Sequence, residues 1–217
     1  MAESLQAAIF DVDGMLLDTR EFIFQAYEYS LAKHGHEVPN RIVIAEQIGR
    51  SLPDCYEAFA PSGELDALCD THHEFQAEQL HIISSYEGLI EMLDTLQSGG
   101  LKLAAFSSRK GNLVPSLKNA GILHYFGIVV QGDDVQHHKP HPEGLLKALY
   151  ALSVEPAHAV MLGDAAVDIE AGKRAKVALT VGITHGFGTR EALKGAKPDF
   201  IVDDLASIAP LLLGNLV

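Results

Sequence analysis

Six apolar segments, each six residues long, constrain the fold of this chain more than any other feature. They occupy residues 5–10, 101–106, 126–131, 158–163, 177–182 and 198–203. Short apolar runs of this kind are typical of strands that are buried on both faces of a sheet. From residue 85 onward they alternate with segments of helical spacing, which favours parallel strand pairing. The sequence therefore predicts an α/β fold, a doubly wound parallel sheet with helices on both faces.

The helical segments of this region are the second part of that pattern. They lie at 87–98, 112–119, 142–152, 168–176 and 205–213. In the first of them Leu89, Met92 and Leu93 share one helical face, and Gly99 follows as a stop signal.

Residues 17–83 interrupt the alternation of strands and helices. Helical patterns cover 19–33, 41–48, 53–59 and 62–83, with Thr19 as the expected N-cap of the first, and we predict no strand in 17–82. We therefore expect a small helical bundle inserted after the first strand. The predicted core domain comprises residues 1–16 and 84–217, and the predicted helical cap domain comprises residues 17–83.

Charge and composition narrow the class of partner. Acidic residues outnumber basic ones by 29 to 16, giving a formal net charge of −13, which argues against a nucleic-acid surface. Apolar runs stay well below the roughly 18 residues of a membrane-spanning helix, and the opening MAESLQ lacks the features of a signal peptide. The thiols of Cys55 and Cys69 do not form a disulfide framework. We expect a cytoplasmic protein without membrane partners, whose oligomeric state stays open.

Polar side chains follow four of the predicted strands at the point where each strand ends. They are Asp11 and Asp13, then Ser107, Ser108 and Arg109, then Lys139, and finally Asp164 and Asp168. In doubly wound sheets, ligands bind outside the carboxyl ends of the strands. Clustered carboxylates favour a hard cation such as Mg²⁺, and hydroxyl and ammonium groups can hold phosphate oxygens. One carboxylate can attack phosphorus while a second transfers a proton, so this set predicts phosphoryl transfer.

Four stretches of the sequence resemble the motifs of the haloacid dehalogenase superfamily in its phosphatase form. They are DVDGMLLDT (11–19), LAAFSSR (103–109), HHKPHPEG (137–144) and GDAAVDIEAGKRA (163–175), and they occur in the family's order. The resemblance extends over about residues 5–182. It implies a Rossmann-like core with a helical cap inserted after the first strand, and a Mg²⁺-dependent phosphatase that forms an aspartyl-phosphate.

The resemblance also implies a role for each matching acidic residue. Asp11 would be the nucleophile and a Mg²⁺ ligand. Asp13 would be the general acid and base, with its backbone carbonyl on the metal. Asp164 would be a further metal ligand and Asp168 a supporting partner. Because dehalogenases of the family lack the second aspartate, Asp13 argues against halide displacement.

The phosphate-binding groups follow in the same way. Ser107 would bind phosphate through its hydroxyl and Ser108 through its backbone, while Lys139 would neutralise the charge of phosphate and of Asp11. We interpret Arg109 as a residue of the rim. His137, His138 and His141 are interpreted as the edge of the active site rather than as a zinc site, because no cysteine lies near them.

The substrate is inferred from a looser resemblance. Residues 181–189 and 196–208 look like the C-terminal segment of phosphoglycolate phosphatase-like and pyrophosphatase-like members, and 48–54 looks like their substrate loop. Arg50 in that loop would bind an anionic leaving group, because a guanidinium can fork onto a carboxylate or phosphate. A small phosphorylated metabolite, 2-phosphoglycolate first, is the expected substrate. Inorganic pyrophosphate and sugar phosphates remain alternatives, as does a phosphomutase of the same fold.

Two non-enzymatic hypotheses complete the set. A phospho-acceptor module of the signalling-receiver kind also places aspartates at strand ends, but it is shorter and has no helical insertion. A silent binding protein on this fold would not need Asp11, Asp13, Lys139 and Asp164 together. We therefore expect an enzyme.

Overall fold

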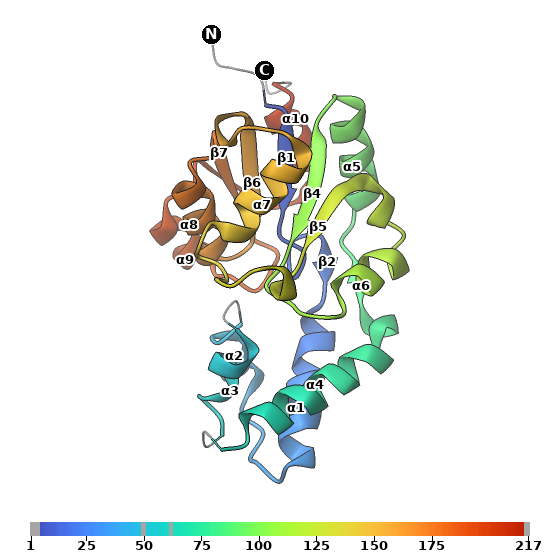
Figure 1. Cartoon of the computed structure of the whole chain (residues 1–217), viewed down its shortest axis with the longest axis vertical. Helices are drawn as coiled ribbons and strands as arrows, with labels where there is room; N and C mark the ends of the chain where they lie inside the picture. Colours follow the sequence, from blue (N-terminus) through green and yellow to red (C-terminus); the bar gives the residue numbers. More distant parts are fainter. Residues whose placement is uncertain (1–4, 49–50, 61–62, 215–217) are drawn as a thin grey trace.

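A wholly parallel, six-stranded sheet forms the centre of the computed structural model, which describes residues 5–48, 51–60 and 63–214 (Figure 1). The strands are β1 (Ala7–Phe10), β4 (Lys102–Phe106), β5 (Phe126–Val130), β6 (Ala159–Gly163), β7 (Leu179–Ile183) and β8 (Phe200–Val202). Their spatial order is β5-β4-β1-β6-β7-β8, so β1 lies between the two halves of the sheet. The predicted fold class and all six predicted strands are confirmed.

Helices cover both faces of the sheet. They are α5 (Leu89–Ser98), α6 (Leu113–Asn119), α7 (Glu143–Leu152), α8 (Ala166–Ala175), α9 (Arg190–Ala196) and α10 (Ile208–Leu212). Ala8 and Phe10 of β1 belong to the core cluster that contains α5, α6 and α10, whereas Ala7 and Ile9 belong to the cluster that contains α7. Successive residues of a strand point to opposite faces, so β1 is apolar throughout because both faces are covered.

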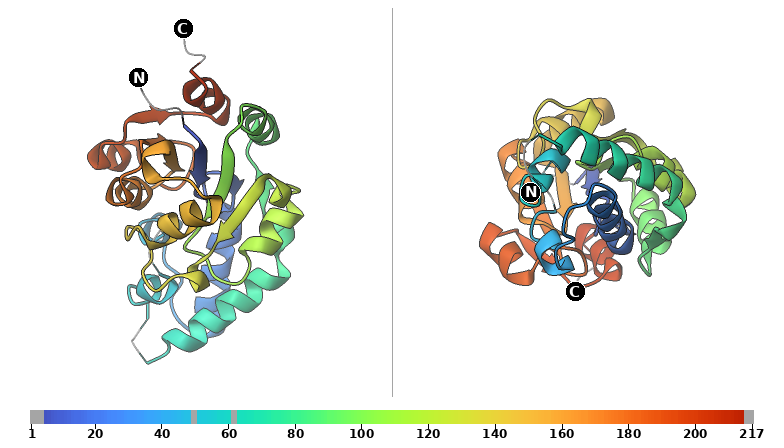
Figure 2. Two further views of the ribbon diagram at one scale, coloured as in Figure 1. Left: turned by 45° about the horizontal axis from the view of Figure 1, so that its top comes forward. Right: turned by 90° about the horizontal axis from the view of Figure 1, so that it is seen from below.

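In the described part of the insertion after β1, four α-helices share a hydrophobic core of their own. They are α1 (Arg20–Lys33), α2 (Arg41–Ala45), α3 (Leu52–Tyr56) and α4 (Leu65–Glu78). Phe22, Tyr27 and Leu31 of α1 pack in one cluster with Tyr56 and Leu68. In Figures 1 and 2 these helices lie beyond the carboxyl ends of the sheet strands. We propose on this basis that residues 17–83 form a cap domain over a core of residues 1–16 and 84–217.

The connection into the insertion differs from the prediction. We predicted no strand in 17–82, but Leu17–Asp18 (β2) lies in this range and pairs with Ser84–Ser85 (β3) as a two-stranded antiparallel ribbon. Strands of two residues are too short to leave a periodic pattern in the sequence, which explains the error. The ribbon ties the entry and exit of the insertion to each other.

Helix ends account for further differences. Thr19 occupies the N-cap position of α1 as predicted, but its side chain makes no capping hydrogen bond, and the Arg20 amide donates to Asp18 Oδ1 at 3.2 Å. Helix α9 was not predicted, although Thr189 caps it by accepting from the Ala192 amide. Of the predicted helical segment 62–83, the described residues 63–83 are helical only over α4 and a 3₁₀ turn at Leu80–Ile82. The segment 205–213 begins with a 3₁₀ turn at Leu205–Ser207. Within the described residues, no helix has the length and apolarity that a bilayer crossing requires.

Candidate active site

The register of the sheet brings Asp11 and Asp164 together. Phe10 at the end of β1 pairs with Leu162 of β6, and the Asp11 amide donates to the Leu162 carbonyl at 2.8 Å. The chain then turns at Gly14, whose φ of +84° is left-handed and where a Cβ would collide with Asp164 Oδ2. Only glycine fits such a turn without strain, so Gly14 allows the loop after β1 to run directly over Asp164.

Lys139 joins two of the acidic residues. Its Nζ donates to Asp11 Oδ1 at 2.5 Å and to Asp168 Oδ1 at 2.7 Å, and all three side chains are buried. Burial alone would lower the pKa of Lys139, but the charges of Asp11 and Asp168 outweigh it and raise that pKa. The other oxygen of Asp168 accepts from the Ala165 amide at 3.0 Å, so Asp168 also fixes the start of α8.

The carboxylates of Asp11, Asp164 and Asp168 form a group that suits a cation. Their ligand oxygens lie within 4.8 Å of one another. Burial raises the pKa of Asp11 well above its usual range even though Lys139 opposes the shift. Burial, followed by the charge of Asp168, raises the pKa of Asp164 to about 7. The single positive charge of Lys139 therefore does not compensate the negative charges of the three carboxylates. Their ligand atoms are all oxygens, which are the ligands that Mg²⁺ prefers.

Asp13 is held from the loop after β4. The Ser107 hydroxyl donates to Asp13 Oδ2 at 2.9 Å, and Arg109 Nη2 lies 3.3 Å from Asp13 Oδ1. The Arg109 side chain is 8% exposed, so our interpretation of it as a rim residue was wrong. It missed that the chain turns back after Ser107, where the Arg109 amide donates to Ser107 Oγ at 3.1 Å.

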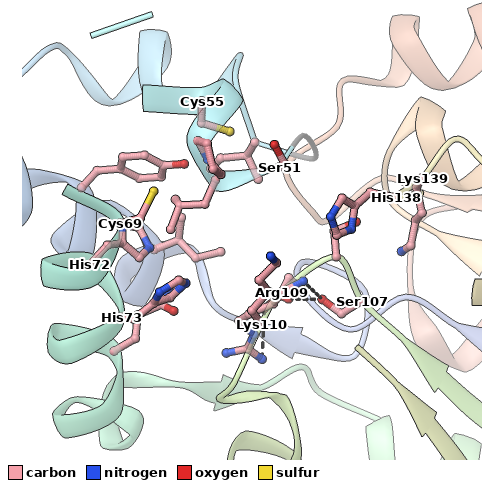
Figure 3. A pocket seen from close by; sticks show the side chains of 18 of the residues that line it. Ser51, Cys55, Cys69, His72, His73, Ser107, Arg109, Lys110, His138 and Lys139 are labelled. Atoms are coloured by element: carbon pink, nitrogen blue, oxygen red, sulfur yellow. Dashed lines mark hydrogen bonds and ion pairs between the residues drawn. The ribbon is translucent and has the colours of Figure 1, made fainter. Parts of the chain in front are cut away.

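A cavity of about 480 Å³ lies between the core and the helical insertion. The core side includes Asp11, Asp13, Ser107, Ser108, Lys110, His138, Lys139 and Asp168. The insertion contributes Ile23, Tyr27, Leu52, Cys55, Asp66, Cys69, Asp70, His72 and His73, among others. Figure 3 shows side chains of the two sides facing each other across the opening. The sequence-predicted phosphate-binding residues thus line one cavity together with Asp11 and Asp13. Arg50, predicted to read the leaving group, lies outside the described residues.

Sequence reasoning missed the cap side of this cavity. Helix α4 buries Leu68, Cys69, His72 and Gln76, which follow one another at helical spacing. That spacing was visible in the sequence, but it indicated packing within the cap and not a cavity wall. His72 does pack inside the cap, because its Nδ1 lies 2.9 Å from the Tyr56 hydroxyl.

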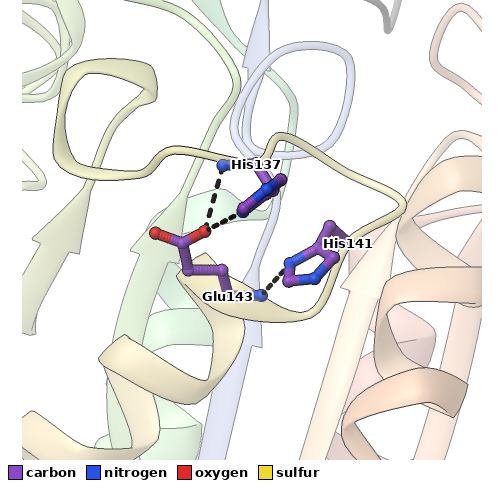
Figure 4. A group of neighbouring side chains, drawn as sticks. All are labelled: His137, His141 and Glu143. Carbon is purple, nitrogen blue, oxygen red and sulfur yellow. Dashed lines mark hydrogen bonds and ion pairs between the residues drawn. The ribbon is translucent and has the colours of Figure 1, made fainter.

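His137, His141 and Glu143 form a second group of side chains that could hold a metal, with ligand atoms within 4.8 Å of one another (Figure 4). The Glu143 carboxylate accepts from two backbone amides and from His137 Nδ1 at 2.9 to 3.0 Å. His141 Nδ1 accepts from the Glu143 amide at 3.3 Å. Because these three side chains are already engaged in hydrogen bonds within the segment, we interpret them as a structural contact that holds the Lys139 loop against the start of α7. Of the three histidines predicted at the edge of the active site, His138 lines the cavity, whereas His137 and His141 are not among the residues that line it.

Comparisons with known proteins agree with this fold. Residues 8–181 match the family model described as haloacid dehalogenase-like hydrolase. The pyrophosphatase PpaX of Bacillus pumilus is 31% identical over 211 residues, which are 96% of this chain and 97% of that protein. A solved structure described as a predicted phosphoglycolate phosphatase from Haemophilus somnus has a TM-score of 0.89 at 22% identity, covering 97% of this chain and 99% of that one. CbbY of Rhodobacter sphaeroides, solved with phosphate, has a TM-score of 0.83 at 22% identity and covers 94% and 96%.

Proposed function

The chain belongs to the haloacid dehalogenase-like hydrolases, and on that premise we propose that it is a Mg²⁺-dependent phosphatase of a small phosphate monoester. The observation that carries the proposal is the placement of Asp11. It is a buried carboxylate at the end of β1, it pairs with Lys139, and it opens onto the cavity. A carboxylate held in this way can attack phosphorus as a nucleophile.

Asp11 and Asp164, with the backbone carbonyl of Asp13, are the groups that would hold Mg²⁺. When bound, the ion supplies positive charge that offsets the carboxylates and the phosphate oxygens. Lys139 compensates the charge of Asp11, and Asp168 keeps the Lys139 ammonium in place.

Two steps then give hydrolysis. An Asp11 carboxylate oxygen forms a bond to phosphorus while the bond to the leaving oxygen breaks, and protonated Asp13 gives its proton to that oxygen. The Asp13 carboxylate next takes a proton from water, whose oxygen attacks phosphorus, and the bond to Asp11 breaks to release phosphate. Protons and bonds balance over the cycle, and Asp13 ends protonated as it began.

Phosphate oxygens need donors of their own during both steps. Ser107 donates to Asp13 in this structure, so its hydroxyl has to turn from Asp13 to the phosphate when substrate binds. Ser108 lines the same part of the cavity and would contribute its backbone. Hydrogen-bond donors to the phosphate oxygens are a large part of phosphoryl-transfer catalysis.

The first candidate substrate is 2-phosphoglycolate, a small phosphorylated metabolite. The proposed phosphatase would act in the cytoplasm. Arg50 would bind the carboxylate of this substrate. Inorganic pyrophosphate is the second candidate, because the similarity to the pyrophosphatase PpaX covers nearly the whole length of both chains. Sugar phosphates are the third candidate, and the enzyme would either hydrolyse them or transfer their phosphoryl group as a phosphomutase.

The test is phosphate release with Mg²⁺ from 2-phosphoglycolate, pyrophosphate, several sugar phosphates and an aryl phosphate, with EDTA as the control. We expect metal-dependent release that is fastest with 2-phosphoglycolate. A preference for pyrophosphate or a sugar phosphate would change the substrate and keep the chemistry. No metal-dependent release from any of these compounds would overturn the proposed activity.

A further inference from the structure

Arg109 is a buried cation next to the site that the mechanism above does not use. Its Nη2 lies 3.3 Å from Asp13 Oδ1, and its Nη1 donates to Ser116 Oγ of α6 at 3.0 Å. Its guanidinium carbon lies 5.6 Å from the centre of the Phe22 ring of α1. The loop after β1, a helix of the core and the first helix of the insertion therefore meet at one side chain.

Residues 107–109 hold both oxygens of the Asp13 carboxylate. Ser107 Oγ donates to Oδ2 at 2.9 Å, while Arg109 faces Oδ1. The segment is itself fixed, because the Arg109 carbonyl accepts from the Gly132 amide at 2.9 Å. The position of the Asp13 carboxylate is thus set by one short and well-anchored piece of chain.

The contact between Arg109 and the Asp13 carboxylate nevertheless lacks a hydrogen bond. Within the described residues, Nε and Nη2 of Arg109 and Oδ1 of Asp13 are buried without a hydrogen-bond partner. The contact between Arg109 and Asp13 is therefore an ion pair without a well-aligned hydrogen bond. Such a contact attracts the carboxylate without locking it, which suits a group that has to reach a leaving oxygen.

We propose that Arg109 is a positioning residue for Asp13, and that its contact with Phe22 links the placement of Asp13 to the helical insertion. The inference rests on the proposed function, in which Asp13 transfers a proton. A planar guanidinium suits this place because it can contact a carboxylate, a hydroxyl and an aromatic face at once. Loss of Arg109 should impair proton transfer to the leaving group more than phosphate binding.

The dependence of kcat/KM on the leaving group tests this role. p-Nitrophenyl phosphate releases a stable anion that needs little protonation, whereas phenyl phosphate and an alkyl phosphate release oxygens that need a proton. Arg109→Met removes the charge and keeps an unbranched stem. We expect it to lower kcat/KM for phenyl and alkyl phosphate about tenfold more than for p-nitrophenyl phosphate. Arg109→Lys keeps the positive charge but lacks the planar guanidinium. Its substrate-dependent loss of kcat/KM should lie between the values for the wild type and Arg109→Met.

Two further variants complete the experiment. Phe22→Leu should also lower kcat/KM more for phenyl and alkyl phosphate than for p-nitrophenyl phosphate, but by a smaller factor. If Arg109→Met does not fold, Phe22→Leu and Arg109→Lys together test the proposal. Arg174→Met is the matched control, because Arg174 is an exposed residue of α8 that pairs with Glu170. It should leave all three kcat/KM values unchanged.

The outcomes separate this inference from the proposed function. If Arg109→Met and Phe22→Leu lower kcat/KM by one common factor for every substrate, or not at all, the positioning role is wrong while the phosphatase proposal stands. If the wild type shows no Mg²⁺-dependent turnover of these phosphates, the proposed function fails and this inference fails with it.

Discussion

Lys139 Nζ lies 2.5 Å from Asp11 Oδ1, although 128 positions separate the two residues in the sequence. The contact joins the loop after β5 to the end of β1, and Asp168 extends it to the start of α8. A single ammonium therefore connects three of the four strand ends that carry polar chemistry. Changes to this ammonium and to the groups around it should have measurable consequences.

Lys139→Met should reduce both activity and stability. It leaves Asp11 and Asp168 buried without their cation, and breaking a buried pair in this way typically costs about 3–5 kcal/mol. We expect phosphate release to fall by about a hundredfold or more, and the free energy of unfolding to fall in urea titrations.

A double variant and a control separate these two effects. Adding Asp168→Asn to Lys139→Met removes one unpaired charge and should recover stability without recovering activity. Lys147→Met is the matched control, because Lys147 is half exposed and its Nζ contacts the surface residue Asp134, donating to the carbonyl at 2.9 Å and lying 3.9 Å from Oδ1. It should change stability by less than about 0.5 kcal/mol. A Lys139→Met protein as stable and active as the wild type would contradict the assigned role.

Gly14→Ala should destabilise the protein more than Gly35→Ala. Both glycines have a left-handed φ, +84° and +77°, so alanine is strained at either position. A Cβ at Gly14 would also collide with Asp164 Oδ2, whereas nothing lies within 4 Å of one at Gly35. Backbone strain alone costs on the order of 1 kcal/mol. Urea unfolding of both variants measures how much more the free energy of unfolding falls at Gly14 than at Gly35. Equal falls in the two variants would mean that the loop can move away from Asp164.

His72 should make the protein less stable in acid. Burial, with a smaller contribution from His73, lowers the pKa of His72 from 6.5 to about 3 in the folded state. Between these values the unfolded chain binds more protons, so stability is full above pH 6.5 and falls as the pH drops below it. The loss from this group is up to about 1.4 kcal/mol per pH unit.

Urea unfolding from about pH 7.5 to about 5 checks this slope. His72→Asn, which keeps an acceptor for the Tyr56 hydroxyl, should lose less stability over the range than the wild type. His124→Asn removes an exposed histidine and should retain the wild-type slope. Parallel profiles for the wild type and His72→Asn would show that His72 does not carry the effect.

Mg²⁺ should stabilise the folded protein through Asp11 and Asp164. An ion that binds the folded state at a hundred times its Kd adds about 2.7 kcal/mol. Thermal unfolding with Mg²⁺ and with EDTA measures this without any substrate. Asp164→Asn should lose the difference, while Asp203→Asn, at an exposed carboxylate paired with Arg190, should keep it. The same Mg²⁺ effect in Asp164→Asn would place the ion elsewhere.

Much of the fold was predictable because the strands of the parallel sheet are mostly apolar and a polar residue follows each of them. The run that ends at Phe10 places Asp11 at the sheet edge, and the run that ends at Gly163 does the same for Asp164. Parallel pairing then brings such residues to one edge whatever the intervening sequence. For that reason Asp11, Asp13, Ser107 and Lys139 could be grouped before their contacts were known.

Contacts that depend on side-chain direction could not be predicted in this way. Arg109 follows Ser107 by two residues, and no periodic pattern indicates that its guanidinium turns toward Asp13. The ribbon of β2 and β3 has two residues in each strand, too few for alternation to be seen. The cavity wall formed by α4 required knowledge of how the insertion lies on the core.

Acid quenching of the enzyme during turnover tests the proposed role of Asp11 most directly. The wild-type protein is mixed with Mg²⁺ and substrate, stopped in acid within the first turnover, and digested for mass spectrometry. We predict one phosphoryl group on the peptide that contains Asp11, and none in Asp11→Asn, which should also lose turnover. Phosphate on another residue, or full turnover by Asp11→Asn, would contradict the assignment of Asp11 as the nucleophile.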